Sequence, residues 1–236
     1  LFGTLSADPA AHDIAQVTVI KGGARAVDFD RSGGFLVDSL SKSGSSSWAG
    51  QASFRLQNHT MSADLKNAIS RFEQDKTWTT VNLGGPLLKD RLFFYGSYYR
   101  PDNSRENRSN LYGPLPAYSL KRNEGFGKLT YTPNSSVLLN ASYRQSKKVE
   151  ESDLFAANAA ATSGSGSESR QKIFTADGSW IISPKSYASF KFTRFENPGQ
   201  GRPDITSDAV PSTTIGSRID PTNLDKLGRF TVPTLL

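Results

Sequence analysis

Hydrophobic and polar residues alternate with a period of two along most of the chain between residues 47 and 196. The clearest case is 48–56, where one face carries Trp48, Gly50, Ala52, Phe54 and Leu56 and the other face is mostly polar. The same alternation predicts further strands at about 77–87, 91–100, 120–132, 136–146, 171–182 and 186–196. These segments predict an all-β chain built on an antiparallel sheet with one apolar and one polar face.

The strand at 136–146 shows how the two faces differ. Val137, Leu139, Ala141 and Tyr143 face one way, and Asn140, Ser142 and Arg144 face the other. The strand at 120–132 alternates less regularly, because Phe126 falls on the face opposite Leu129 and Tyr131. A β-bulge near Gly125 or Gly127 would place all three on one face, so we expect a bulge there.

Short and long connections follow one another along the predicted sheet. Lys89-Asp90, Pro133-Asn134 and Ser183-Pro184-Lys185 read as tight turns, whereas 59–76, 101–119, 147–169 and 197–228 read as long polar loops. In the first loop, Leu65, Ile69 and Phe72 have the spacing of a short helix. Short turns at one end and long loops at the other, with strands of about ten residues, are typical of a membrane-spanning β-barrel. A soluble β-sandwich or jelly roll would alternate in the same way.

The composition of the chain limits the classes of protein to which it can belong. The chain has 236 residues, a hydrophobic fraction of 36% and no cysteine, and it contains no apolar run long enough for a transmembrane helix. The net charge is +6, but lysine and arginine are scattered singly, which predicts solvated loops and a polar interior rather than a nucleic-acid interface. Contact with acidic lipid headgroups is an alternative use of this charge. No signal peptide precedes the first strand, so we expect an internal piece of a longer precursor.

No constellation of residues predicts catalysis, so we expect no enzyme, no cofactor and no metal site. The two histidines, His12 and His59, are far apart in sequence, and the Gly33-Gly34 pair lacks the context of a nucleotide-binding loop. Six aromatic residues in or near strands predict a girdle at a lipid–water boundary, with ordinary packing within the sheet as the alternative: Trp48, Trp78, Tyr98, Tyr99, Tyr143 and Trp180. Arg55, Asn140 and Arg144 are expected to face the interior, where packing against a segment that fills it is favoured and ligand contact is the alternative; no ligand can be named.

The first 43 residues differ from the rest. Residues 14–20 alternate as a strand, and Gly33-Gly34 leads into a second β-prone segment. Ser43-Gly44-Ser45-Ser46-Ser47 reads as a flexible joint. We therefore divide the chain into an N-terminal unit at 1–43, a linker at 44–47 and a sheet-forming unit at 48–236.

Two blocks, read in order, resemble a known family. The segments 17–23, 31–37 and 41–44 resemble the end of the plug domain of TonB-dependent outer-membrane receptors, where a strand, a glycine pair and a "TKSG"-like exit lead into the barrel. Trp48-Ala49-Gly50 resembles the start of the first barrel strand. The stretch from Leu83 to Tyr99 resembles the "GGP…KD…FFF" region of the Oar-like subgroup.

This resemblance implies a 22-stranded barrel filled by a plug, of which the chain carries the tail of the plug and about seven strands. It implies a receptor in the outer membrane of a Gram-negative bacterium that takes up a bulky ligand, with membrane lipid, the TonB complex and the transported ligand as partners. Two other functions stay open. One is a barrel that does not transport and acts in adhesion or with other envelope proteins; the other is a soluble β-sandwich binding module.

Overall fold

The computed structural model describes residues 11–21, 35–61, 72–110, 113–153, 164–203, 216–219 and 226–230. Antiparallel β-structure dominates these residues, so the prediction of an all-β chain with a large antiparallel sheet is confirmed. The only helices in the described segments are two single 3₁₀ turns, η1 (Ala11–Asp13) and η2 (His59–Met61). Neither is long or apolar enough to cross a membrane.

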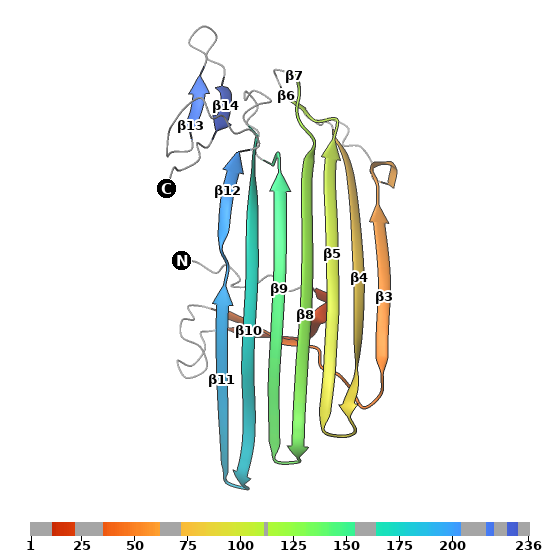
Figure 1. Ribbon diagram of the computed structural model, residues 1–236, viewed down its shortest axis with the longest axis vertical. Coiled ribbons are helices and arrows are strands. Elements are labelled where there is room, and N and C mark those ends of the chain that lie inside the picture. Colours follow the sequence, from red (N-terminus) through yellow and green to blue (C-terminus); the bar gives the residue numbers. More distant parts are fainter. Residues whose placement is uncertain are drawn as a thin grey trace.

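One curved sheet makes up most of the molecule (Figure 1). Its strands lie in the order β11-β10-β9-β8-β5-β4-β3, so neighbours in space are neighbours among the long strands of the sequence. Their bounds are β3 (Ala49–Gln57), β4 (Glu73–Leu88), β5 (Leu92–Glu106), β8 (Tyr118–Asn134), β9 (Val137–Glu151), β10 (Ser165–Ser183) and β11 (Ser186–Glu196). Beyond the end of β11, β12 (Gly199–Pro203) continues the pairing with β10.

Tight turns join the strands at the lower end in Figure 1, where sequence analysis placed them. Between β4 and β5, Asp90 adopts a φ of 58° and the backbone N–H of Arg91 donates to the carbonyl of Leu88 at 3.1 Å. Between β8 and β9, the side chain of Asn134 accepts a hydrogen bond from the N–H of Ser136 at 2.9 Å. These short side-chain and backbone bonds close the turns locally, which is why sequence alone predicts them.

At the upper end the strands are longer than predicted. β4, β5, β8, β9 and β10 have 15 to 19 residues rather than about ten, so the loops expected at 101–119 and 147–169 are wrong in extent. The hydrogen-bonded ladder continues above the apolar segment, where both faces are polar and the alternation disappears. Five short strands in the described residues were not predicted: β6 (Ser109–Asn110), β7 (Gly113–Pro114), β12, β13 (Gly216–Ile219) and β14 (Lys226–Phe230). The helix expected at 65–72 lies almost entirely outside the described residues.

The bulge expected near Gly125 or Gly127 is wrong. β8 keeps one register from Ser119 to Tyr131 against β9, and the irregularity lies after Tyr131. Phe126 faces the concave side of the sheet, where it packs against Tyr95 and Arg144, whereas Leu129 faces the convex side. The two hydrophobic residues serve different surfaces, so no bulge is needed to bring them together.

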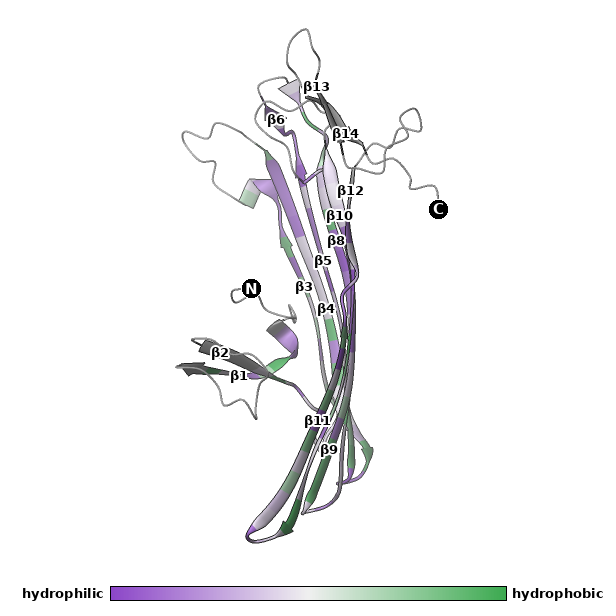
Figure 2. Ribbon diagram, turned by 90° about the vertical axis from the view of Figure 1, so that its left-hand side faces the viewer, coloured by the Kyte–Doolittle hydropathy of each residue, from purple (hydrophilic) through white to green (hydrophobic). Residues whose placement is uncertain are grey.

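A separate two-stranded sheet precedes the large one. β1 (Ile14–Lys21) pairs antiparallel with β2 (Phe35–Ser41), and η1 leads into β1. Figure 2 shows this pair projecting from the concave side of the large sheet, with β1 and β2 running across it. Residues 42–48, here called the strap, connect β2 to β3 without regular structure. The predicted strand at 14–20 is confirmed, and Gly33-Gly34 lies outside the described residues.

Candidate functional site

A cluster of buried charges joins the N-terminal segment to the concave face of the sheet. Asp13, at the end of η1, and Glu124, in the middle of β8, are the largest fully buried side chains of the described residues. Arg144 on β9 lies between them: its Nη2 is 3.1 Å from Oδ2 of Asp13, and its Nη1 donates to Glu124. Arg122 donates to the other carboxylate oxygen of Glu124. The two carboxylates and two guanidinium groups balance one another in charge.

Aromatic rings enclose this charge cluster. The Tyr95 hydroxyl donates to Oδ1 of Asp13 at 3.2 Å, and the guanidinium of Arg144 lies 4.5 Å from the centre of the Phe126 ring. The ring of His12 packs against that of Tyr99 at 5.1 Å. Burial lowers the pKa of His12, and the adjacent Asp13 carboxylate only partly opposes that effect. His12 is therefore stable in its neutral form while the N-terminal segment is docked.

The end of β2 and the strap continue the contact toward the lower end of the sheet. Lys128 Nζ donates to the carbonyl oxygen of Ser41 at 3.3 Å, and the backbone N–H of Lys42 donates to the carbonyl of Asp13 at 2.7 Å. At Gly44 the strap touches the sheet so closely that a Cβ would lie 2.2 Å from the carbonyl oxygen of Phe94. Only a glycine lets the backbone approach this far.

Buried charge contacts of this kind fix the position of the N-terminal segment relative to the large sheet. A buried ion pair contributes little net stability, but removing one partner leaves an uncompensated charge and costs about 3–5 kcal/mol. Because Arg144 is shared between Asp13 on the N-terminal segment and Glu124 on the sheet, the two parts depend on the same guanidinium. Loss of Arg144 is therefore expected to weaken docking of the N-terminal segment.

The three residues proposed from sequence as interior candidates all face the concave side, but they do not form one site. Arg144 belongs to the charge cluster. Asn140 lies lower on β9, where it accepts from Thr130 and donates to Asp177, both at 2.9 Å. Arg55 lies on β3, with its guanidinium 5.8 Å from the Trp78 ring centre. Asp13 and Glu124 were missed: an inward carboxylate next to Phe126 was a usable signal for Glu124, whereas nothing local marked Asp13.

The convex face carries the second feature, an exposed apolar belt. Many large hydrophobic side chains on this face are 40–68% exposed, including Phe54 on β3, Leu129 on β8, Trp180 on β10 and Phe190 on β11. The register of every ladder places them on the same side, opposite the charge cluster. Figure 2 shows that the belt occupies the lower half of the sheet and that the upper half is hydrophilic. Such an extended exposed apolar surface marks a contact with lipid or protein.

The upper edge of the belt crosses the strands obliquely. On β3 the uppermost exposed hydrophobic residue is Leu56, which pairs with Thr77 of β4. On β11 it is Phe192, and the ladder pairings across the sheet place Phe192 in the same row as Gly85 of β4. The edge thus moves by about 8 residues (85 − 77), or ~26 Å, over six strand spacings of ~4.8 Å each, ~29 Å in total. It makes an angle of about 40° with the register rows.

The predicted aromatic girdle is only partly compatible with this arrangement. Trp48, Tyr98, Tyr143 and Trp180 are exposed on the convex face, at the borders of the belt. Trp78 and Tyr99 face the concave side, so their assignment to the girdle is wrong. Tyr99 instead packs on His12, and Trp78 on Arg55.

The chemistry of the cluster is that of recognition and docking. His12 Nε2 lies 3.2 Å from Asp13, and His59 Nδ1 lies 3.2 Å from Asp75. The Asp75 contact is a hydrogen bond that orients the His59 ring, whereas His12 Nε2 makes no hydrogen bond to Asp13, and neither contact involves a hydroxyl nucleophile. Across the residues that the structure describes, no group of three histidine, aspartate or glutamate side chains could hold a metal ion.

Comparison with known proteins adds no relative. No family model, curated protein or solved structure matches the chain.

Proposed function

We propose that this chain forms part of a membrane-spanning β-barrel whose interior is occluded by its N-terminal segment, and that it acts as a TonB-dependent outer-membrane receptor for a bulky ligand. The observation that carries the proposal is the placement of two opposite surfaces on one sheet. The convex face carries an exposed apolar belt, and the concave face holds a docked segment through buried charges.

The belt supports the membrane-spanning part of the proposal. If its upper edge lies in a membrane plane, the strands tilt by about 40° from the membrane normal, within the ~35–45° of outer-membrane barrels. From Phe174 to Ile182, β10 rises ~26 Å along the strand, or ~20 Å along that normal, close to the ~25 Å apolar band of such barrels. A soluble sandwich would instead bury this face against a second sheet.

The edges of the sheet support a larger, closed structure. In the described part of the chain, β3 pairs only with β4, and β11 pairs only with β10. Unpaired backbone groups are costly in hydrocarbon, so both edges need further strands when the sheet is in a membrane. These strands come from additional sequence or from a partner chain, and they complete a lumen around the N-terminal segment.

The docked segment supports the transport part. β1 and β2 project from the concave side of the sheet (Figure 2), where a plug would occlude the lumen of a closed barrel. The resting receptor is closed by this plug, and an inner-membrane complex of the TonB type displaces it when ligand is bound. The long upper ends of the strands and their connections carry the ligand-binding surface, while the short turns face the periplasm.

Electrical recording from planar bilayers tests this proposal. The native protein should insert and show little steady conductance, whereas a variant lacking residues 1–43 should form large, stable channels. A matched control with Arg55→Gln alters an exposed concave-face side chain without affecting docking, and it should behave like the native protein.

Three outcomes separate the alternatives. A native protein that inserts and already conducts as freely as the shortened variant would favour a barrel without an occluding plug, such as an adhesin. A protein that never inserts would favour a soluble β-sandwich. Binding of the periplasmic domain of TonB to the closed protein, increased by ligand, is the result expected for the receptor.

A further inference from the structure

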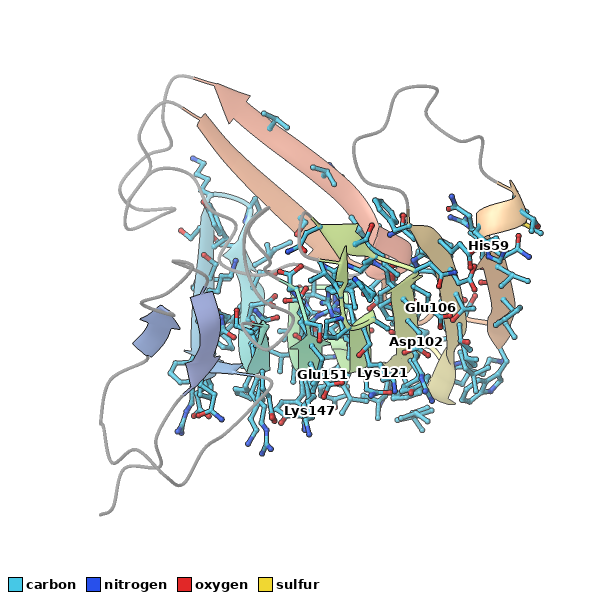
Figure 3. All side chains as sticks on the ribbon, turned by 90° about the horizontal axis from the view of Figure 1, so that it is seen from above. His59, Asp102, Glu106, Lys121, Lys147 and Glu151 are labelled. Atoms are coloured by element: carbon cyan, nitrogen blue, oxygen red, sulfur yellow. The ribbon has the colours of Figure 1, made fainter. Side chains whose placement is uncertain are left out.

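A basic cluster lies directly above the apolar belt on the convex face. It consists of Lys121 on β8, Lys147 on β9, and Arg170 and Lys172 on β10. The ladder registers place all four on the side of the sheet opposite the charge cluster. Figure 3, seen from above, shows Lys121 and Lys147 on this outer side of the sheet.

The charge of this basic cluster is only partly neutralised. Lys147 and Arg170 share one carboxylate, that of Glu168, at 3.5 and 3.0 Å. Four cations and one carboxylate give a local charge of +3 (4 − 1). The neighbouring cations on the same face differ, because Arg100 pairs with Asp102 and Arg194 pairs with Glu196. Asp102 lies directly opposite Lys121 in the β5–β8 ladder, but it is paired with Arg100, so the excess positive charge lies on β8, β9 and β10.

Its height above the belt fits a lipid headgroup. Lys147 lies four residues beyond Tyr143, the uppermost exposed hydrophobic residue of β9, and Lys172 lies two residues from Phe174 on β10. At ~3.3 Å per residue and a ~40° tilt, these cations lie roughly 5–10 Å above the belt. The headgroup layer of a bilayer extends over about the same distance from the hydrocarbon.

We propose that this basic cluster binds the phosphate groups of an anionic lipid in the leaflet that surrounds the upper part of the sheet. The inference rests on the proposed membrane-spanning function and adds a lipid partner to it. Lysine and arginine stems extend along the apolar surface and present their charges to phosphate oxygens. Glu151 lies two residues above the row of Lys121, where Ser119 donates to it at 3.2 Å, so this carboxylate borders the cluster on the side away from the belt.

Native mass spectrometry of the detergent-solubilised protein tests this inference. Equal amounts of dioleoylphosphatidylglycerol and dioleoylphosphatidylcholine are added, and the dissociation constant of each retained lipid is measured. The protein should prefer phosphatidylglycerol. Each cation near the surface contributes a factor of about five, so Lys121→Gln, Lys147→Gln and Lys172→Gln together should reduce this preference at least tenfold.

A matched control removes three cations from the concave face. The changes Lys76→Gln, Lys148→Gln and Lys191→Gln alter the net charge equally and should leave the preference unchanged. Free inorganic phosphate at millimolar concentration should not displace the lipid, because it lacks the acyl chains that the belt holds. An equal affinity for both lipids, or an equal loss in the two triple variants, would overturn the inference.

The result is distinguishable from failure of the proposed function. A protein that inserts into bilayers but does not discriminate between the two lipids would contradict only the lipid site. A protein that stays soluble without detergent would contradict both.

Discussion

Replacing Arg144 with methionine should release the N-terminal segment from the sheet. Methionine keeps an apolar stem over the Phe126 ring but removes both ion pairs, leaving Asp13 without its arginine and Glu124 with Arg122 alone. Arg144 is only 6% exposed and Asp13 only 1%, so solvent cannot replace the lost partner. Breaking a buried pair from one side costs about 3–5 kcal/mol.

The loss of docking free energy in the Arg144→Met protein can be measured from backbone hydrogen exchange in β1 and β2. An isolated pair of strands is marginally stable, so the amides of this pair exchange when the segment undocks. A loss of about 3–5 kcal/mol increases the population of the undocked state between roughly a hundredfold and a few thousandfold. Peptides from 14–21 and 35–41 should lose protection by that factor, while peptides from β8 and β9 should keep theirs.

Two further variants make this test specific. Asp13→Asn combined with Arg144→Met removes one positive and one negative charge, leaving Glu124 paired with Arg122, and should restore part of the protection. Arg55→Met, on the same concave face but outside the charge cluster, should change nothing. Protection of β1 and β2 within threefold of the native value in the Arg144→Met protein would show that the charge cluster does not hold the segment.

Three other changes follow from the same structure. Gly44→Ala would place a Cβ against the Phe94 carbonyl, so it should weaken docking by about 1–3 kcal/mol, seen as faster exchange in β2; an unchanged rate would exclude the close approach. Because burial lowers the pKa of His12, protonation favours the undocked state: protection of β1 should be complete above pH 6.5 and fall as the pH drops below it. His12→Gln should abolish that dependence, and a native profile independent of pH between 5 and 7.5 would contradict it. Phe190→Arg on the belt should cost about 2–4 kcal/mol of membrane-inserted stability, measured by urea unfolding in lipid, whereas Lys191→Arg on the concave face should be neutral.

The sequence predicted the strands wherever one face is apolar. The alternation of Val137, Leu139, Ala141 and Tyr143 correctly separated the two faces of β9, and the short turn at Lys89-Asp90 correctly marked the end of β4. The upper halves of β8, β9 and β10 were missed, because hydrogen-bonded backbone rather than apolar periodicity holds them in the sheet. The irregular alternation around Phe126 is real, but the bulge inferred from it near Gly125 or Gly127 is wrong. Phe126 faces the concave side because it packs against Tyr95 and Arg144, and these contacts cannot be read from the sequence.

The candidate site was harder to predict. Arg144 was identified because it occupies an inward position in a regular strand, and the same reasoning selected Arg55 and Asn140, which have other partners. Asp13 lies more than a hundred residues from Arg144 in sequence, and no local pattern links the two. Their pairing depends on where the N-terminal segment docks, which is a property of the tertiary structure.

If this sheet belongs to a closed barrel in the outer membrane, the native protein should need detergent for its extraction from outer membranes. In gel electrophoresis the unheated form should migrate faster than the heated form, since a closed barrel resists unfolding by dodecyl sulfate. A protein that is released without detergent and shows the same mobility before and after heating would contradict the closed barrel.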